Sequence, residues 1–429
     1  MMNISIPYGR ERLEFQVPKR NLVDVLHPNE ITPPDSEKGE IETAIDHPIG
    51  TKKLNEIVRP NDRVVIICED ITRPTPADKI LPVLLDRLHA AGIANDDILI
   101  VMALGSHRPM TEAEMAEKVG QEIFAQVRVV NSEFQDKSKL VDLGRAPGGV
   151  RVWIDQRVVA GDIKIGVGHI VPHPGAGYTG GGKIIYPGVA GAETVAQFHL
   201  RSALLNRNIL GDEENLARQE MEGWIDTVGL DFIINCILTP EDRIYRVVAG
   251  HYVKAHRTGV KFSRQVYGVR AREKVDIVVV SAHPADIDFW QGGKGLLSGD
   301  LIVKDGGSLI LTAPCFEGVG PHPSFLDYCG ADNPDRLLNE ARQGKVDANE
   351  ALPLSVGVMT ARIIKRTKIG IVSKGLSEEQ AKRAKLEYFS DLDGALQAAL
   401  SRHGRGAKVS VIPYGGHTYP YRVWKSLFP

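Results

Sequence analysis

Residues 63–103 read RVVIICEDITRPTPADKILPVLLDRLHAAGIANDDILIVMA, and this stretch decides the fold. Two short β-branched runs, 63–68 and 98–103, have the length and composition of strands. Between them lies an amphipathic stretch, 77–91. Pro74 and Pro76 keep the connecting loop from continuing as a strand, and a helix can start at about Ala77. The order strand, helix, strand predicts α/β layers with a largely parallel sheet.

The same alternation continues along the rest of the chain. The first residues, 1–15, read as a first strand, and later strands are expected at 127–130, 163–167, 232–238, 275–281, 308–312, 368–372 and 408–412. Further helices are expected at 112–118, 193–205 and 377–387. The sequence therefore predicts an α/β fold with largely parallel, doubly wound sheets. Ligands in such folds bind at loops beyond the carboxyl ends of the strands.

The length of the chain predicts two domains, because 429 residues are too many for one ordinary core. Residues 251–274, HYVKAHRTGVKFSRQVYGVRAREK, are basic and weakly apolar, and a fresh strand, VDIVVVSA, follows them. We interpret this segment as a helix that leads into the second domain. The predicted domains are residues 1–270 and 271–429, with the active site in the cleft between them.

Composition excludes several classes of function. The formal net charge is −2, so the chain lacks the excess of positive charge expected of a protein that binds nucleic acid or an anionic membrane. No apolar run reaches the roughly 18 residues of a membrane-spanning helix, and the N-terminus lacks the apolar core of a signal peptide. The four cysteines, Cys68, Cys236, Cys315 and Cys329, form no CxxC pair. We expect reduced, mostly structural thiols in a cytoplasmic protein.

Two loops after predicted strands carry candidate functional side chains. The first, residues 69–76, contains Asp70, Thr72 and Arg73, and the fork of an arginine suits bidentate binding of a carboxylate. An arginine at the surface, paired with Asp70, is the competing interpretation. The second loop places His107 before a helix whose start is marked by the capping-box pair Thr111 and Glu114. This position favours a catalytic histidine, although a solvated loop histidine fits the same pattern.

The strongest candidate is the loop of residues 166–183, GVGHIVPHPGAGYTGGGK. Its glycines, among them Gly180, Gly181 and Gly182, would let the backbone approach a ligand and present N–H groups to anions. The end of the loop fits GxxxxGK, but Ile184 follows Lys183 where a nucleotide-bound Mg²⁺ needs Ser or Thr. A nucleoside triphosphatase is therefore a poor fit, and Lys183 remains a candidate functional amine.

Histidines around this loop allow a second interpretation. On spacing alone, His169, His173 and His199 could form a metal site with nitrogen ligands, as in a zinc hydrolase. In the second domain, residues 289–295, FWQGGKG, follow a strand and set Trp290, Gln291 and Lys294 in a glycine-flanked loop. A functional loop and a simple turn both fit that segment.

Together these segments resemble the nickel-dependent lactate racemase family, the nickel-pincer 2-hydroxyacid racemases and epimerases. The resemblance covers most of the chain. It is carried by DITRPTP at 70–76, GSHRPMT at 105–111, WQGGKG at 290–295 and, above all, GHIVPHPGAGYTGGGKIIYPGVAGAETVAQFH at 168–199. It implies an isomerase whose first domain binds the cofactor and whose second domain closes the substrate pocket.

The resemblance also implies a cofactor, a pyridinium-3-thioamide-5-thiocarboxylic acid mononucleotide that holds nickel through one carbon and two sulfurs. Lys183 matches the lysine that forms the thioamide link, and His199 matches the histidine that completes the nickel coordination. Soft sulfur donors with an imidazole suit Ni(II). We expect Asp70, Thr72 and the glycines 180–182 to contact the cofactor. Separate cofactor-synthesis enzymes are implied as partners, and a homodimer is our expectation for the assembly.

The substrate implied by the resemblance is a small 2-hydroxy acid. His107 and His173 match the two acid/base histidines, and Arg73 matches the clamp for the substrate carboxylate. Gln291, Lys294 and Trp290 are expected to line the substrate pocket. One histidine takes the hydroxyl proton while the C2 hydride moves to the cofactor. The keto acid rotates before the hydride returns to its other face, and histidine suits both directions near neutral pH.

Two departures from the lactate enzymes bear on the substrate. The stretch that aligns near 354–359, within LPLSVGVM, has no Trp where the lactate enzymes carry one, and Trp290 stands where a Tyr is expected. Both point away from lactate itself and leave the 2-hydroxy-acid core intact. The alternative function is a non-catalytic binding or carrier protein for a phosphorylated ligand or cofactor, which would have no need of two loop histidines.

Overall fold

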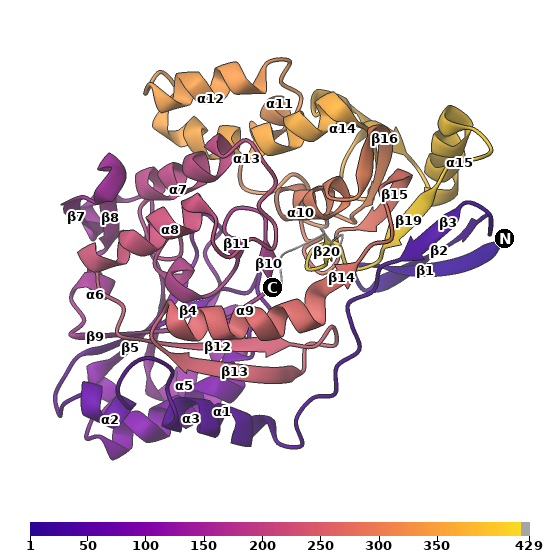
Figure 1. The fold of residues 1–429 in the computed structure, drawn as a ribbon. Coiled ribbons are helices and arrows are strands. Elements are labelled where there is room, and N and C mark those ends of the chain that lie inside the picture. The colour runs from indigo at the N-terminus through magenta and orange to yellow at the C-terminus, as the bar shows by residue number, and fades with distance from the viewer. Residues whose placement is uncertain (422–429) are drawn as a thin grey trace, which may run out of the picture.

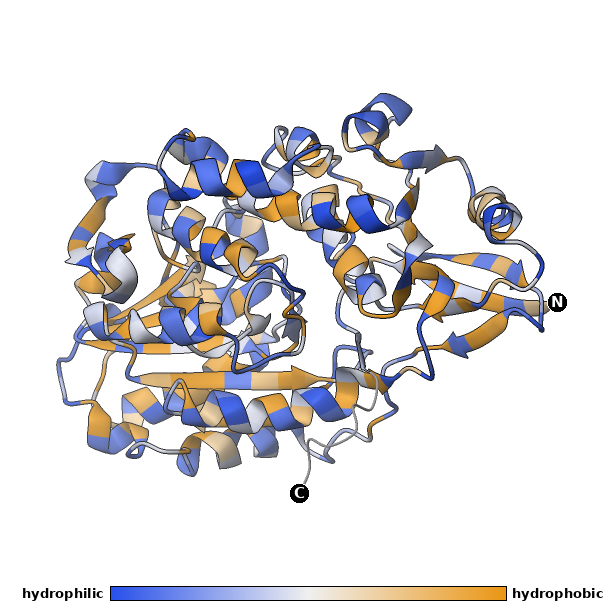
Figure 2. Ribbon diagram, turned by 45° about the horizontal axis from the view of Figure 1, so that its top comes forward, coloured by the Kyte–Doolittle hydropathy of each residue, from blue (hydrophilic) through white to orange (hydrophobic). Residues whose placement is uncertain are grey.

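The structure, a computed structural model, describes residues 1–421. Two six-stranded sheets lie side by side, each with its own helices, as Figure 1 shows. The strands of both sheets are largely hydrophobic, whereas most helices alternate hydrophobic and hydrophilic residues (Figure 2). An α/β fold with largely parallel sheets was predicted and is confirmed.

The first sheet has the strand order β13-β12-β9-β4-β5-β6. Its strands are β4 (Val64–Glu69), β5 (Ile98–Ala103), β6 (Arg128–Asn131), β9 (Ile163–His169), β12 (Phe232–Leu238) and β13 (Ile244–Gly250). All neighbours pair in parallel except β12 and β13, which are antiparallel. The carboxyl ends of β4, β5 and β9 therefore meet at one edge of the sheet.

Both faces of this sheet are buried, which explains why its strands are continuous apolar runs. On one face the sheet packs against α1 (Glu37–Asp46) and α3 (Ala77–Ala90), and on the other against α9 (Lys254–Tyr267). In β4, the side chain of Ile66 packs into the core on the face covered by α1 and α3, and that of Ile67 packs into the core on the face covered by α9. The alternation of side chains along a strand thus supplies two apolar layers.

The second sheet has the order β18-β17-β16-β15-β19-β3, and all its neighbours are parallel. Its strands are β3 (Leu22–Val25), β15 (Val275–Ser281), β16 (Val303–Thr312), β17 (Lys368–Val372), β18 (Glu387–Phe389) and β19 (Val409–Ile412). Helix α10 (Phe289–Asp300) covers the face that turns toward the first domain, and α15 (Leu392–His403) covers the other.

The N-terminal segment departs from the predicted division at residue 270. The hairpin of β1 (Met2–Tyr8) and β2 (Glu11–Val17) packs with α15 on the second sheet, and β3 pairs with β19 in that sheet. About the first 25 residues therefore belong in space to the second domain, and the chain crosses between the domains twice. Apolar burial decides this placement, because Ile6 and Val17 complete the core of the second sheet.

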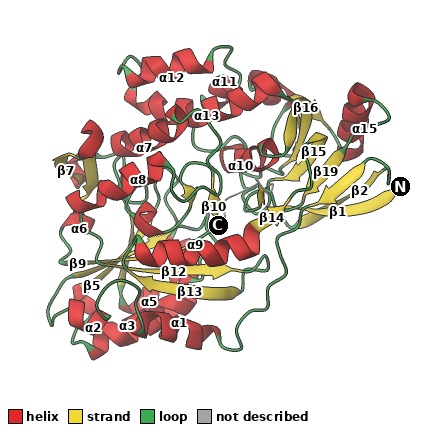
Figure 3. Cartoon of the chain, viewed as in Figure 1, coloured by secondary structure: helices red, strands yellow, loops and turns green. Residues whose placement is uncertain are grey.

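The remaining elements are shorter or connect the two sheets (Figure 3). The strands are β7 (Leu140–Arg145), β8 (Arg151–Asp155), β10 (Pro172–His173), β11 (Gly177–Tyr178), β14 (Gly268–Arg270) and β20 (Tyr419–Tyr421). The helices are α2 (Leu54–Ile57), α4 (Glu112–Val119), α5 (Gln121–Gln126), α6 (Gln156–Val159), α7 (Ala192–Leu204), α8 (Leu216–Gly223), α11 (Phe325–Cys329), α12 (Pro334–Arg342), α13 (Ala348–Arg366) and α14 (Glu378–Arg383).

Two predicted elements need correction. Residues 289–295 were expected to form a loop or a turn, but they are the first two turns of α10, whose N-cap Asp288 accepts a hydrogen bond from Gln291 N. The helix predicted at 377–387 ends at Arg383 in α14, and β18 begins at Glu387. No helix within residues 1–421 is long and apolar enough to cross a membrane.

Candidate active site

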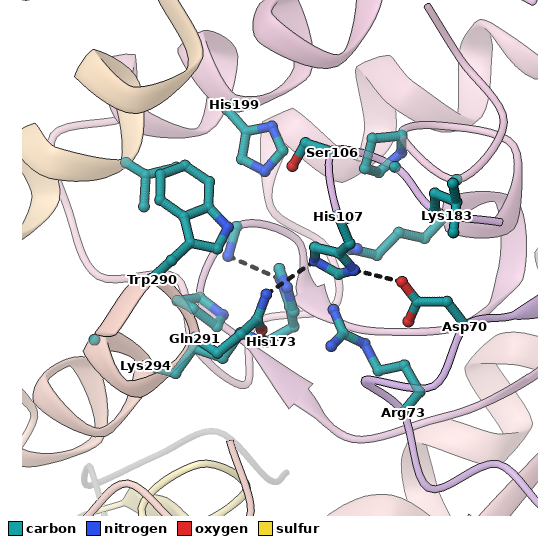
Figure 4. A pocket seen from close by; sticks show the side chains of 18 of the residues that line it. Asp70, Arg73, Ser106, His107, His173, Lys183, His199, Trp290, Gln291 and Lys294 are labelled. Atoms are coloured by element: carbon teal, nitrogen blue, oxygen red, sulfur yellow. Dashed lines mark hydrogen bonds and ion pairs between the residues drawn. The ribbon is translucent and has the colours of Figure 1, made fainter. Parts of the chain in front are cut away.

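A cleft of about 1000 Å³, part of it open to solvent, lies between the two domains. One wall comes from the loops after β4, β5 and β9 and from α7, and the opposite wall comes from α10, α11 and α13. The cleft thus sits where parallel strands present their carboxyl ends, the usual ligand position in open α/β sheets. It brings together Asp70, Arg73, His107, His173, Lys183, His199, Trp290, Gln291 and Lys294 (Figure 4).

His107 is held by a carboxylate on one side and an amide on the other. Its Nδ1 donates to Asp70 Oδ2 at 2.6 Å, and Thr72 Oγ1 lies 3.2 Å from the same nitrogen. Thr72 also donates to Asp70 from both its backbone N and its hydroxyl. Burial opposes ionisation of Asp70, but His107 and Arg73 outweigh it and hold the pKa of this carboxyl well below its usual range. The proton on Nδ1 leaves Nε2 with a lone pair toward the cleft.

The amide that meets His107 comes from the second domain. Gln291 Nε2 lies 2.9 Å from His107 Nε2 and donates to it, and Gln291 Oε1 accepts from Lys294 Nζ. Figure 4 shows His107 between Asp70 and Gln291. Burial, followed by the charges of Arg73 and Lys183, lowers the pKa of Lys294 well below its ordinary value. The acid/base candidate of the first domain is therefore oriented by both domains.

Arg73 lies in the loop after β4 and points into the cleft (Figure 4). Its guanidinium donates to the carbonyl and the hydroxyl of Thr72, at 3.2 and 3.0 Å. Its own carbonyl accepts from the buried Lys118 Nζ at 2.5 Å, which anchors the loop. Arg73 forms no salt bridge with another described residue, so its fork is available to an anionic ligand.

His173 belongs to the small hairpin of β10 and β11. Gly177 allows this hairpin to form, because its φ is +73° and a Cβ there would lie 1.8 Å from the carbonyl oxygen of Asp212. The backbone N–H of Gly175 donates to His173 Nδ1 at 3.0 Å, so the neutral ring carries its proton on Nε2. Burial, and then the charges of Lys183, Lys294 and Arg73, lower the pKa of His173 well below its ordinary value.

The two histidines are therefore prepared differently. His107 offers a lone pair at Nε2, whereas neutral His173 offers an N–H at Nε2. In these states His107 can accept a proton from one oxygen, while neutral His173 can donate a hydrogen bond to another within the same cleft.

Lys183 follows the glycine-rich hairpin in a short 3₁₀ helix, η4 (Gly181–Ile184). Its amine lies 5.9 Å from the centroid of the Phe198 ring, and it forms no salt bridge with any described residue. Burial, and then the positive charge of Arg73, lower the pKa of Lys183 from 10.5 to about 7. A substantial share of this amine is neutral and nucleophilic near neutral pH.

His199 lies on α7 and its ring faces the cleft from the first domain. Its Nδ1 donates to the carbonyl oxygen of Val195 at 2.9 Å, which leaves the Nε2 lone pair free. Burial lowers the pKa of His199 to about 3, so the ring is neutral at physiological pH. A neutral imidazole oriented through its other nitrogen is a good metal ligand.

The glycines 180–182 do not line the cleft. A Cβ on Gly180 would lie 2.7 Å from Ile170 and one on Gly181 would lie 2.9 Å from the carbonyl of Tyr252, so protein atoms fill the space beside them. Gly181 N also donates to Asn235 at 2.8 Å. These glycines allow close packing behind Lys183, whereas the glycines that line the cleft are Gly105, Gly175, Gly188 and Gly293.

His169 is turned away from the cleft and pairs with Glu69. Its Nδ1 lies 2.6 Å from Glu69 Oε2, and Thr75 donates to the same oxygen. Burial would raise the pKa of Glu69, but the charge and hydrogen bond of His169 lower it to about 2. Within residues 1–421, no three His, Cys, Asp or Glu side chains gather as a metal site. The zinc site of His169, His173 and His199 is therefore not formed.

The resemblance points to the stretch near 354–359 as bearing on the substrate, whereas Leu297, Phe325 and Thr360 were not predicted from the sequence. Leu297, Phe325, Val356, Met359 and Thr360 make up the wall near Trp290, whose ring packs against Phe325 and His322 with centroids 5.0 and 4.7 Å away. On α13, Val356 and Met359 are half-buried and stand three residues apart. In sequence this spacing is the same as that of ordinary core residues, so no local signal separates them.

Comparisons with known proteins agree with this architecture. The sequence model of the lactate racemase N-terminal domain matches residues 8–210, and that of the lactate racemase C-terminal domain matches residues 270–417. The chain is 30% identical over 424 residues to a lactate racemase of Thermoanaerobacterium thermosaccharolyticum, covering 97% of this chain and 98% of the relative. It is 30% identical over 422 residues to a lactate racemase of Lactiplantibacillus plantarum, covering 97% and 99%.

Solved structures give the same result. The lactate racemase apoprotein from Thermoanaerobacterium thermosaccharolyticum superposes with a TM-score of 0.87 and 29% identity, covering 98% of this chain and 100% of that one. A protein from Thermotoga maritima shares the fold, with a TM-score of 0.69 at 18% identity over 90% of this chain and 98% of that one.

Proposed function

The chain belongs to the lactate racemase family, and from this premise we propose that it is a racemase or epimerase that inverts the C2 centre of a 2-hydroxy acid. The observation that carries the proposal is the pair His107 and His173, which share one cleft with Arg73 and offer complementary ring nitrogens. A racemase must handle the hydroxyl proton from either side of C2, and a single base serves only one of them.

The substrate carboxylate is held by the cationic end of the cleft. Arg73 has no carboxylate partner among the described residues, and one side of its fork is free of the hydrogen bonds to Thr72. Lys294 has a buried amine, and both residues line the cavity. His107 Nε2 lies 2.9 Å from the Gln291 amide, so a hydroxyl group that replaces this contact can pass its proton to the ring. Asp70 stabilises the imidazolium that results, and Gln291 and Lys294 keep the oxygen in place. His173 serves the other side of C2.

We further propose that Lys183 and His199 hold a nickel-pincer nucleotide. When bound, that group supplies the acceptor and donor for the C2 hydride. The donor chemistry of the chain fits it: the Lys183 amine is neutral enough to form a thioamide link, and the His199 lone pair is free for a metal. His199 would be the single ligand from the protein, which agrees with a cofactor that brings its own sulfur donors.

The cofactor contact expected of Asp70 and Thr72 stays a prediction. Both are also hydrogen-bonded in the network around His107, so we propose that they position this histidine. The glycines 180–182 act on the cofactor through the position of Lys183, since their own surfaces are packed against Ile170, Ile225 and Tyr252.

The test is to produce the protein together with the cofactor-synthesis enzymes and to follow racemisation of C2-deuterated 2-hydroxy acids by chiral chromatography. We expect bound nickel, a mass adduct on the peptide that contains Lys183, and racemisation that retains the C2 deuterium. Lys183→Ala should abolish all three, whereas Lys52→Ala, at an exposed position, should leave them unchanged.

Three outcomes would overturn parts of this proposal. A folded protein with neither nickel nor an adduct would exclude the cofactor. Loss of the C2 deuterium to solvent would indicate proton abstraction at carbon instead of hydride transfer. Tight ligand binding without inversion of any 2-hydroxy acid would favour the carrier function.

A further inference from the structure

The cleft is divided into a polar end and an apolar end. Arg73 lies at the polar end, beside the Asp70 and His107 pair, and Trp290 lies across the cleft from it (Figure 4). Around Trp290 the wall consists of Leu297 on α10, Phe325 on α11, and Val356 and Met359 on α13. The second domain thus supplies the whole apolar wall.

The side chains that form this wall are uncharged; Lys294 also lines the cleft from α10, but its amine is engaged by Gln291. The ionised groups that line the cleft, such as Arg73, Lys183 and Asp70, belong to the polar side described above. Two polar side chains lie near the apolar wall: Thr360, which is only 2% exposed, and His322, whose ring packs against Trp290 with the centroids 4.7 Å apart. A carboxylate or a hydroxylated chain placed here would lose its hydration without gaining partners, which is unfavourable.

The wall also leaves room for a ligand. Gly293 of α10 lines the cleft, and a Cβ built on it would meet nothing closer than the Phe325 ring, at 3.9 Å. The helix would therefore tolerate a side chain here, and its absence widens the cavity. Val356 and Met359 are half-buried, so part of each apolar surface faces the cleft. An unbranched methionine adapts its shape to different ligands.

The orientation of the substrate follows from the two ends. If Arg73 holds the carboxylate and the C2 oxygen faces His107 or His173, the remaining C2 substituent points toward Trp290 and Met359. Both enantiomers must be accepted, so this substituent takes two orientations against the same wall. A wide wall with a flexible methionine meets that need better than a tightly fitted methyl pocket.

We propose that the substrates are 2-hydroxy acids with a large apolar C2 substituent, branched aliphatic or aromatic, in preference to the methyl group of lactate. This inference rests on the proposed racemase function. Each buried methylene contributes about fourfold to kcat/KM. An isobutyl group, with three more carbons than a methyl, should therefore be favoured by roughly 60-fold, within the range found for hydrophobic pockets.

The experiment compares four substrates on the cofactor-loaded enzyme: lactate, 2-hydroxy-4-methylpentanoate, 3-phenyllactate and malate. We expect kcat/KM for the two large apolar acids to exceed that for lactate by at least tenfold, and malate to be the poorest substrate. Equal or better turnover of lactate or malate would refute the inference while leaving the racemase function intact. No inversion of any of the four acids, or of other 2-hydroxy acids, would instead count against the racemase function.

A substitution that fills the space beside the apolar wall tests whether this wall contacts the C2 substituent. Met359→Trp should reduce kcat/KM for 3-phenyllactate at least tenfold more than it reduces kcat/KM for lactate. Lys365→Trp adds the same side chain at an exposed position of α13, outside this cleft, and should change neither. If Met359→Trp leaves the ratio of kcat/KM for 3-phenyllactate and lactate unchanged, the C2 substituent does not bind against Met359.

Binding gives a readout that does not depend on cofactor loading. Calorimetry on the cofactor-free protein should show tighter binding of 4-methyl-2-oxopentanoate than of pyruvate, by about tenfold or more. Met359→Trp should reduce that ratio. Equal affinity for the two keto acids in the wild-type protein would contradict an apolar subsite.

Discussion

The Lys183 amine should react with an acylating reagent near neutral pH much faster than an ordinary surface lysine. Its pKa is lowered to about 7, so about half of the amine is neutral at pH 7, against about one part in 2,500 for a lysine of pKa about 10.4. The neutral fraction is therefore about 1,000-fold larger. A lower pKa also reduces nucleophilicity, by about 30-fold for a Brønsted slope like that of thiols, which leaves about a 40-fold advantage.

The assay uses cofactor-free protein, treated briefly with acetic anhydride between pH 6 and pH 10, and measures acetylation of each lysine by peptide mass spectrometry. The rate at Lys183 should reach half its maximum near pH 7. Exposed Lys52 serves as the reference residue. After burial, the positive charge of Arg73 is the largest cause of the low pKa of Lys183. Arg73→Gln removes this charge, so the pH at which acetylation of Lys183 reaches half its maximum should rise. Arg63→Gln, at an exposed salt bridge with Asp162, should leave it unchanged.

The same pKa has a consequence for stability. The pKa of Lys183 is lower in the folded protein than in the unfolded chain, so the unfolded chain binds more protons between pH 7 and pH 10. Burial of Lys183 therefore destabilises the folded state most at pH 7 and below. Lys183→Met should raise the unfolding free energy at pH 7 by up to about 4 kcal/mol, and the gain should vanish near pH 10. Solvent in the cleft lowers this figure. Labelling of Lys183 no faster than Lys52, together with no gain at pH 7, would refute the reasoning.

Three further predictions concern the other ionisable groups. Asp70→Asn should lower kcat by about 10²- to 10⁴-fold in folded, cofactor-loaded enzyme, because His107 loses the carboxylate that fixes its tautomer; activity within threefold of wild type would argue against a positioning role. Glu69→Gln should lower the unfolding free energy, measured by urea unfolding at pH 7, by about 3 kcal/mol, because the buried ring of His169 loses the carboxylate with which it is paired. This stability contribution is present above the unfolded pKa of Glu69 and should be lost as the pH falls toward about 2; an unchanged midpoint at pH 7 would contradict it. Adding a 2-keto acid to cofactor-free protein should raise the pKa of His173, measured by NMR of its ring, since the carboxylate neutralises the cations that lower it; an unmoved titration would place the anion elsewhere.

Much of the fold could be predicted because local pattern and tertiary environment agree there. Strands β5, β12, β15 and β17 have the predicted bounds, since runs of β-branched residues between turn signals have few alternatives. The failures occur where local pattern is ambiguous. Residues 289–295 contain three glycines and read as a loop, but Asp288 caps them and the apolar contacts of Phe289 and Leu296 hold them in a helix.

The candidate site divides in the same way. Arg73, His107, His173, Lys183, His199, Gln291 and Lys294 could be named because their motifs resemble those of a known family, although the residue types alone left structural alternatives open. All of them line one cleft. Leu297 and Phe325 of the apolar wall could not, because an apolar residue on a helix reads the same whether it faces a core or a ligand. The stretch with Val356 and Met359 was marked only by the resemblance.

The sequence by itself determined the α/β class, the strand ends that carry the functional loops, and the identity of the charged groups. These depend on short-range periodicity and on residue chemistry, both of which are local. Only the tertiary structure decided which groups touch. It joined Asp70, His107 and Gln291 across two domains, turned His169 away toward Glu69, and returned β3 to the second sheet. Burial decides these contacts, because it depends on every element that packs around a residue, however far away in the chain.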